Sequence, residues 1–309
     1  MPFLHMGGDG AEQGYRIYYR MFPETATNEA EVSWTNSSRR PRVIMLMGLG
    51  GNHLAWTPQI EHLAQFCDVC AVDNRGTGYS TAPSRKCRWT TRGMAADATK
   101  VLDALGWDSG VHVVGISMGG MIAQEIALRV PDRIASLSLL ATYSSAFSAM
   151  PTVSAVVDLG ISTGMLSRDQ KKMALSGMRV NFPEEWLRQT RTSSLHGGRV
   201  VENQRWLKKY NVLLNLSVPP ELQKEGHAPP RPASSNTLIK QLAAVSTHRV
   251  GKMQFAELRN RGVPTLVLTG DEDALVRPAN SEAIGRMLGV EVRRIRGCGH
   301  AMIHQCPSE

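Results

Sequence analysis

The sequence predicts an α/β protein whose mostly parallel sheet is covered by helices on both faces. Short, continuously apolar segments recur along the chain, at residues 42–47, 69–73, 111–117, 134–142 and 264–270. Runs of this kind are typical of strands that are buried on both faces. Helix-like patterns lie between them, for example at residues 90–106 and 117–130. Alternating strands and helices predict a parallel, doubly wound sheet.

The amino-terminal part adds an expected edge strand and a surface loop. Residues 15–20, YRIYYR, alternate as an early edge strand would, and residues 25–41 are polar and rich in turn formers. The first thirteen residues, MPFLHMGGDGAEQ, have neither the charged and apolar regions of a secretion signal nor the arginines of a transit peptide. We therefore expect no targeting segment.

The alternation stops after Thr142, and no clear strand follows until the apolar run that begins at residue 264. The intervening stretch holds four helix-like patterns and a proline-rich loop at residues 218–235. Residues 143–244 carry 13 Lys and Arg against 7 Asp and Glu, a net charge of +6. We expect residues 1–142 to form the first part of the core, residues 143–244 a helical lid, and residues 245–309 the second part of the core.

Composition excludes several functional classes. The 309 residues are 42% hydrophobic and 20% charged, and no window approaches the roughly 18 uninterrupted apolar residues of a membrane span. The net charge of +8 comes without a dense basic run, which argues against nucleic-acid binding. Five cysteines, an odd number, favour reduced thiols and a cytoplasmic location. The pair Cys67 and Cys70 lacks a second pair for a zinc site and is expected in the core.

Ser117 is the first candidate for chemistry. It is the middle residue of GISMG, between an apolar strand pattern and a helical pattern. Glycines two residues before and after allow a sharp strand-to-helix turn, which exposes the serine oxygen at the carboxyl end of the sheet. A lone G-x-S-x-G pattern also arises by chance and then marks an ordinary turn serine. The flanking strand and helix favour the nucleophile.

A nucleophilic serine needs a base and an acid that orients this base. Asp271 and Asp273 follow the apolar run at 264–270, and His300 follows VEVRRIRG at 290–297. These positions are carboxyl ends of predicted strands, where open α/β sheets build their sites. Cys298, two residues before His300, is a candidate for sensitivity to thiol reagents.

Backbone N–H groups of Leu49 and Met118 are the candidates for an oxyanion hole. Leu49 lies in the turn GLGG at residues 48–51, directly after the apolar run 42–47, and Met118 follows the candidate nucleophile. The GLGG turn lacks the lysine of a P-loop and the spacing of a dinucleotide motif. We therefore expect no nucleotide site, no cofactor and no metal.

Five segments together resemble the α/β-hydrolase superfamily: RVIMLMGLGGNHLAW, VDNRGTGYS, GISMGG, LTGDEDALV and GCGHAMIHQCP. The resemblance runs from about residue 15 to the end of the sequence. It implies the α/β-hydrolase fold with a helical lid between the sixth and seventh strands. It also implies Ser117 as nucleophile, His300 as base, Asp273 as acid, and Leu49 with Met118 as oxyanion hole.

Further details follow from the same resemblance. Asp73 and Arg75, in VDNRGTGYS, correspond to a structural turn beneath the site and have no catalytic role. Asp273 is preferred to Asp271 because the family spacing is glycine, two residues, then the acid. Met47 stands where many members carry a histidine, and the sequence ends nine residues after His300, where members add a final helix. A truncation is one interpretation, and it bears on activity.

The predicted function is hydrolysis of carboxylic esters or related acyl compounds, such as lactones and thioesters, through an acyl-enzyme. The expected partner is a small acyl or ester substrate, and the sequence leaves the oligomeric state open. Two alternatives remain at this stage. One is a non-catalytic ligand receptor on the same fold. The other is a carbon–carbon bond hydrolase or an acyltransferase that uses the same three residues.

Overall fold

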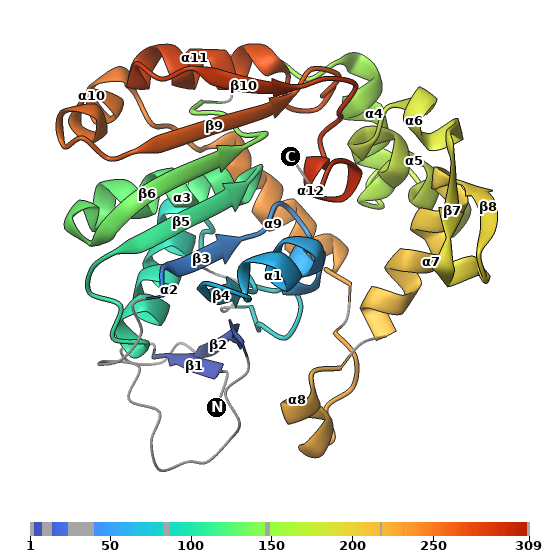
Figure 1. Ribbon diagram of the computed structural model, residues 1–309, viewed down its shortest axis with the longest axis horizontal. Helices are drawn as coiled ribbons and strands as arrows, with labels where there is room; N and C mark the ends of the chain where they lie inside the picture. Colours follow the sequence, from blue (N-terminus) through green and yellow to red (C-terminus); the bar gives the residue numbers. More distant parts are fainter. Residues whose placement is uncertain are drawn as a thin grey trace.

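A central eight-stranded sheet organises the protein, for which a computed structural model describes residues 3–7, 14–23, 40–82, 87–145, 149–216, 218–230 and 232–307. The strand order is β1-β2-β4-β3-β5-β6-β9-β10. The pairs from β4 through β10 are parallel, whereas β1 and β2 join antiparallel. The doubly wound, mostly parallel α/β sheet expected from the sequence is confirmed (Figure 1).

The predicted apolar runs become the inner strands of this sheet. Their bounds are β3 Arg42–Leu46, β4 Asp68–Val72, β5 Val111–Ile116, β6 Ile134–Leu140 and β9 Thr265–Gly270, and β10 is Val292–Ile295. All five residues of β4 are buried, as strands covered on both faces require. Cys67 and Cys70 are buried in this region with free thiols, as expected.

The prediction of an edge strand at residues 15–20 is wrong in its position. These residues form β2, Tyr15–Phe22, but β1, Phe3–Met6, pairs with β2 and is the edge strand. Phe3 of β1 contacts the ring of Tyr18 in β2, with the ring centroids 5.3 Å apart, and Tyr18 is fully buried. A four-residue strand gives too little periodicity to be recognised in a sequence.

Helices cover the two faces of the sheet unequally. One face packs against α2 Thr91–Ala104, α3 Met118–Arg129, α10 Lys252–Asn260 and α11 Pro278–Leu288. The other face packs against the 3₁₀ helix His53–Trp56, α1 Thr57–Leu63 and α12 Met302–Gln305. Alternate residues of each strand serve the two cores, for example Ile44 one and Val43 the other.

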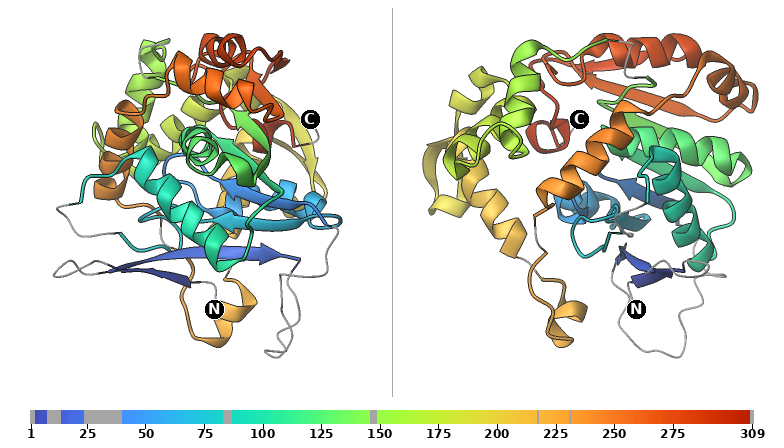
Figure 2. Two further views of the ribbon diagram at one scale, coloured as in Figure 1. Left: turned by 90° about the vertical axis from the view of Figure 1, so that its left-hand side faces the viewer. Right: turned by 180° about the vertical axis from the view of Figure 1, so that it is seen from behind.

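The segment between β6 and β9 stands beyond the carboxyl ends of the parallel strands (Figures 1 and 2). Its helices are α4 Val153–Ser162, α5 Gln170–Asn181, α6 Glu184–Arg188, α7 Asn203–Leu216, α8 Pro220–Lys224 and α9 Ser235–Ser246, followed by α10. This segment lies between the sixth and seventh strands of the large sheet, where the sequence placed the lid. Its limits at residues 143 and 244 remain an expectation.

The expectation of a lid without strands is wrong. A small hairpin joins β7, Thr190–Ser193, to β8, Arg199–Glu202. Between them, Gly197 and Gly198 adopt positive φ angles of 65° and 76°, which side chains rarely tolerate and which reverse the chain. The β-branched residues Thr190, Thr192, Val200 and Val201 favour the extended conformation in the two strands.

Candidate active site

Ser117 lies where β5 turns into α3. Its φ and ψ are 56° and −122°, an unfavourable conformation for a residue with a side chain. The neighbouring strand fixes this backbone, because the Ser117 N–H donates to the Leu140 carbonyl at 2.9 Å. The Thr142 hydroxyl donates to the Ser117 carbonyl at 2.8 Å. The turn is thus held by its backbone groups, and the side chain is left for other contacts.

Two glycines make this turn possible. A Cβ atom on Gly119 would lie 2.0 Å from the Leu46 carbonyl oxygen, and one on Gly115 would lie 2.2 Å from the Gly119 carbonyl oxygen. Neither distance leaves room for a side chain. The G-x-S-x-G pattern therefore reflects a close approach of α3 to β3 and β5, which agrees with its place between a predicted strand and a predicted helix.

His300 and Asp273 form a buried pair at the ends of β10 and β9. The His300 Nδ1 atom lies 2.8 Å from Asp273 Oδ2, and the two residues are 7% and 3% exposed. The second oxygen, Asp273 Oδ1, accepts the backbone N–H groups of Leu275 and Val276 at 2.9 and 2.8 Å. Asp271 is exposed instead. Of the two candidate acids, Asp273 is the one that His300 contacts.

Ser117 and His300 line one cavity with a volume of about 310 Å³. The turn after β3, at residues 47–50, and the ends of the strands line one part of it, and α4 and α5 of the inserted segment line another. The insert also contacts the histidine loop directly, because the Ala301 N–H donates to the Asn181 carbonyl at 3.0 Å. Among the described residues that line this cavity there is no Lys, Arg, Asp or Glu.

Leu49 lines the same cavity, whereas Met118 is fully buried at the start of α3 beneath it. The turn that carries Leu49 packs on the candidate nucleophile, since a Cβ on Gly48 would lie 3.1 Å from the Ser117 Cβ. Strands β3 and β5 are neighbours, and the chain leaves them for opposite sides of the sheet. Such a reversal of strand order creates a crevice in which α/β proteins bind ligands.

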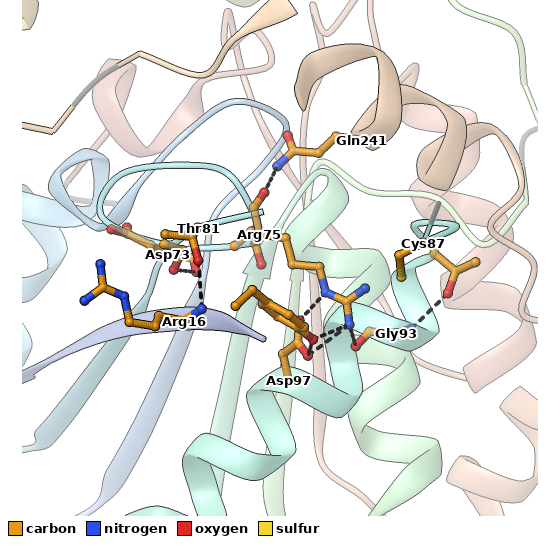
Figure 3. A network of polar contacts seen from close by, with 12 residues as sticks. Arg16, Asp73, Arg75, Thr81, Cys87, Gly93, Asp97 and Gln241 are labelled. Atoms are coloured by element: carbon orange, nitrogen blue, oxygen red, sulfur yellow. Dashed lines mark hydrogen bonds and ion pairs between the residues drawn. The ribbon is translucent and has the colours of Figure 1, made fainter. Parts of the chain in front are cut away.

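Gln241 makes a contact next to the cavity that the sequence did not reveal. It lies on α9 and is fully buried. Its Oε1 accepts the Gly50 N–H at 2.8 Å across 191 residues of sequence, and its Nε2 donates to the Arg75 carbonyl at 3.2 Å (Figure 3). One amide thus links the turn after β3 to the loop after β4. A single glutamine among the apolar residues of α9 is a weak signal of such a role.

Asp73 and Arg75 stabilise that loop, as the family resemblance implied. Asp73 is fully buried and accepts the backbone N–H groups of His53 and Tyr79 at 2.7 and 2.9 Å. The Arg75 guanidinium pairs with Asp97 of α2, and the Nη2 to Oδ1 distance is 2.9 Å (Figure 3). Burial, and then the hydrogen bond to Asp97, raise the pKa of Tyr15 far above its ordinary value.

Replacing Asp97 by asparagine is expected to destabilise the fold by about 3–5 kcal/mol, because one partner of a buried ion pair is lost. Both side chains of the pair are 8% exposed, so water cannot replace the missing charge. Asp103→Asn is the control, since Asp103 is 51% exposed in its pair with Arg133 and such pairs contribute about 0–1 kcal/mol. Urea unfolding measures both variants, and equal losses would contradict the expectation.

His53 and Asp73 form a second histidine–aspartate pair, which does not line the cavity of Ser117. His53 Nδ1 lies 2.9 Å from Asp73 Oδ1, and His53 is 1% exposed. Its Nε2 atom is buried and has no hydrogen-bond partner among the described residues. His248 is also buried, at 3% exposure, and burial lowers its pKa to about 4. Neither lines the cavity of Ser117, whereas His300 does.

The chain belongs to the alpha/beta hydrolase fold family, whose profile matches residues 41–306. A relative from Azorhizobium caulinodans, named "Putative carbamate hydrolase RutD", is 28% identical over 279 residues, 89% of this chain and 82% of that protein. A relative of the same name from Caulobacter vibrioides is 41% identical over 105 residues, 34% of this chain and 38% of its own length. The chain thus matches well under half of the latter protein.

Solved structures show the same fold at low sequence identity. An alpha/beta hydrolase from a Medee basin deep-sea metagenome library, MGS-M2, is 18% identical with a TM-score of 0.68, over 95% of this chain and 90% of that one. The enol-lactonase from Burkholderia xenovorans is 18% identical with a TM-score of 0.64, over 97% and 94%. Within the described part of the chain, every helix falls short of what a bilayer crossing requires.

Proposed function

We propose that the protein is a serine hydrolase that cleaves small, uncharged carboxylic esters and related acyl compounds. One observation carries the proposal: Ser117 and His300 line a single cavity while Asp273 holds the far side of the imidazole. The three residues come from the carboxyl ends of β5, β9 and β10. Nucleophile, base and orienting acid are thereby supplied at one end of the sheet.

The proposed mechanism follows from the hydrogen bonds around His300. Asp273 accepts a hydrogen bond from the Nδ1–H group, so Nε2 carries the lone pair and serves as the base. Ser117 Oγ attacks the substrate carbonyl carbon and transfers its proton to Nε2, which then protonates the leaving group. The N–H groups of Leu49 and Met118 stabilise the negatively charged oxygen. A water molecule then attacks the acyl-enzyme with the same proton transfers, and the carboxylic acid and free Ser117 are released.

The lining of the cavity supports a neutral substrate. The insert carries a net charge of +6, yet no Lys, Arg, Asp or Glu is among the described residues that line the cavity. An anionic substrate would have to leave water without a cationic partner, which is unfavourable. A volume of about 310 Å³ is near the lower limit for ligand pockets, so short acyl groups are favoured. Carbamates share these properties, and the names of the curated relatives support including them as substrates.

A panel of p-nitrophenyl esters tests the substrate class. We expect kcat/KM for the acetate and butyrate esters to exceed that for the succinate monoester by about tenfold or more, since the anion is desolvated without compensation. The octanoate ester tests the preference for short acyl groups, and we expect it to react more slowly than the butyrate ester. A neutral p-nitrophenyl carbamate tests the related substrate. Preference for the succinate monoester at both low and high salt would contradict the proposal of an uncharged substrate.

A serine-reactive fluorophosphonate separates the enzyme from the receptor and from related chemistries. Labelling of Ser117, located by peptide mass spectrometry, is the expected result in a folded sample. Absence of labelling together with tight ester binding would indicate a receptor. Labelling of Ser117 without release of free acid, but with transfer to an added alcohol, would indicate an acyltransferase.

A further inference from the structure

The thiols of Cys298 and Cys306 contact each other next to the loop that carries His300. Cys298 lies between the end of β10 and His300, and Cys306 follows the last residue of α12. The Cys306 thiol points at Cys298, and the distance between the two Sγ atoms is 3.2 Å. Both thiols are free. The contact joins the segment that carries the proposed base to the short helix that follows it.

The two thiols differ in their access to solvent. Cys298 is fully buried in the core on the α1 and α12 face of the sheet, and Cys306 is half-buried at its margin. Burial, and then the contact with Cys306, raise the pKa of the Cys298 thiol. The other cysteines make no such contact among the described residues, and the Cys87 thiol donates to the Arg88 carbonyl instead.

Hydrogen bonds connect the segments of this cysteine pair to the loops of the proposed catalytic residues. The Gln305 side chain, next to Cys306, accepts the Gly299 N–H at 2.9 Å and donates to the Gly297 carbonyl at 2.6 Å. The Cys298 carbonyl accepts the Glu272 N–H at 3.0 Å, directly before Asp273. A displacement of Cys298 therefore acts on both the His300 loop and the loop that presents the acid.

We propose that Cys298 and Cys306 are a site of reversible oxidation, and that the disulfide formed there lowers catalysis by displacing His300. This proposal rests on the proposed role of His300 as the base. A peroxide first oxidises the accessible Cys306 thiol to a sulfenic acid and is reduced to water or an alcohol. Cys298 sulfur then attacks the Cys306 sulfur, the S–S bond forms, and the S–OH oxygen leaves as water with the Cys298 proton. An added dithiol reverses the reaction by exchange.

The geometric consequence is a contraction next to the site. The sulfur atoms must approach from 3.2 Å to about 2.0 Å, and the strand end and α12 must adjust to the fixed geometry of the bond. Cys298 is two residues from His300, so part of this movement reaches the imidazole. Displacements of the order of 1 Å at a catalytic group reduce rates strongly. We expect kcat to fall by about tenfold or more, with a much smaller change in KM.

The test treats the full-length protein with hydrogen peroxide and measures the cross-link and the activity in the same sample. Tryptic mapping without reduction should show the single peptide of residues 297–309, which holds both cysteines, lighter by two hydrogen atoms and resistant to alkylation. The kcat for p-nitrophenyl acetate should fall in parallel and recover with dithiothreitol. The Cys306→Ser variant should keep its basal activity and lose the response, and Cys87→Ser, which removes another partly exposed thiol, should respond like the unmodified protein.

The outcomes distinguish this inference from the proposed function. Absence of the cross-link in folded protein overturns the inference, whatever the activity. A cross-link that leaves kcat unchanged overturns the control of His300. If peroxide also inactivates the Cys306→Ser variant, the oxidation that lowers activity occurs at another residue, and the inference is overturned. If the reduced protein hydrolyses no ester and fluorophosphonate does not label Ser117, the proposed function fails, and with it the control of His300.

Discussion

Replacing Ser117 by alanine is expected to lower kcat for ester hydrolysis by about 10⁴- to 10⁶-fold, the usual loss when a triad nucleophile is removed. The fold should persist because the contacts of Ser117 with Leu140 and Thr142 use its backbone N–H and carbonyl, which alanine retains. Steady-state assays with p-nitrophenyl acetate measure kcat, and thermal unfolding shows whether the variant is folded.

Ser162→Ala is the matched control for this variant. Ser162 also lines the cavity, but its hydroxyl donates to the Leu159 carbonyl at 3.0 Å and lies on α4 of the insert. Its removal should change kcat by no more than a few-fold, since a single neutral hydrogen bond contributes about 1 kcal/mol. If Ser117→Ala keeps full esterase activity, another residue is the nucleophile and the proposed mechanism is wrong.

The sheet was predictable because its physical signal is local. A strand buried on both faces must be mostly apolar, and β3 and β4 depart from this pattern only at their first residues, Arg42 and Asp68. The candidate site residues were predictable for a related reason. Parallel strands end at the same edge of a sheet, so polar residues that directly follow strands, such as Ser117, Asp273 and His300, lie near one another.

The remaining parts of the site depend on contacts between distant segments, which no local pattern encodes. Gln241 meets Gly50 only because α9 crosses the carboxyl ends of the strands (Figure 2). The walls of the cavity come from α4 and α5, whose apolar periodicity is equally compatible with packing and with ligand contact. The hairpin β7–β8 consists of two strands of four residues each, which are too short to show the period of a strand in the sequence.

The choice between Asp271 and Asp273 likewise depends on tertiary packing and not on the local sequence. Their sequence neighbourhood makes both plausible acids, and only a spacing taken from the family separated them. In the folded chain Asp273 is buried against His300, whereas Asp271 is exposed. Burial is a property of how the loop packs between β9 and the histidine segment, where a Cβ on Gly270 would lie 2.1 Å from the Cys298 carbonyl oxygen.

Asp273→Asn is expected to lower kcat by about 10³- to 10⁴-fold, because the amide imposes the wrong histidine tautomer. The N–H groups of Leu275 and Val276 hold Oδ1, so the asparagine oxygen takes that position and its NH₂ group faces His300. His300 Nδ1 must then accept a hydrogen bond, which places the imidazole proton on Nε2 and removes the base. Asp271→Asn should retain near-normal kcat and serves as the control. Steady-state assays of both variants decide the matter: loss of activity in Asp271→Asn with activity kept in Asp273→Asn would reverse the assignment of the acid.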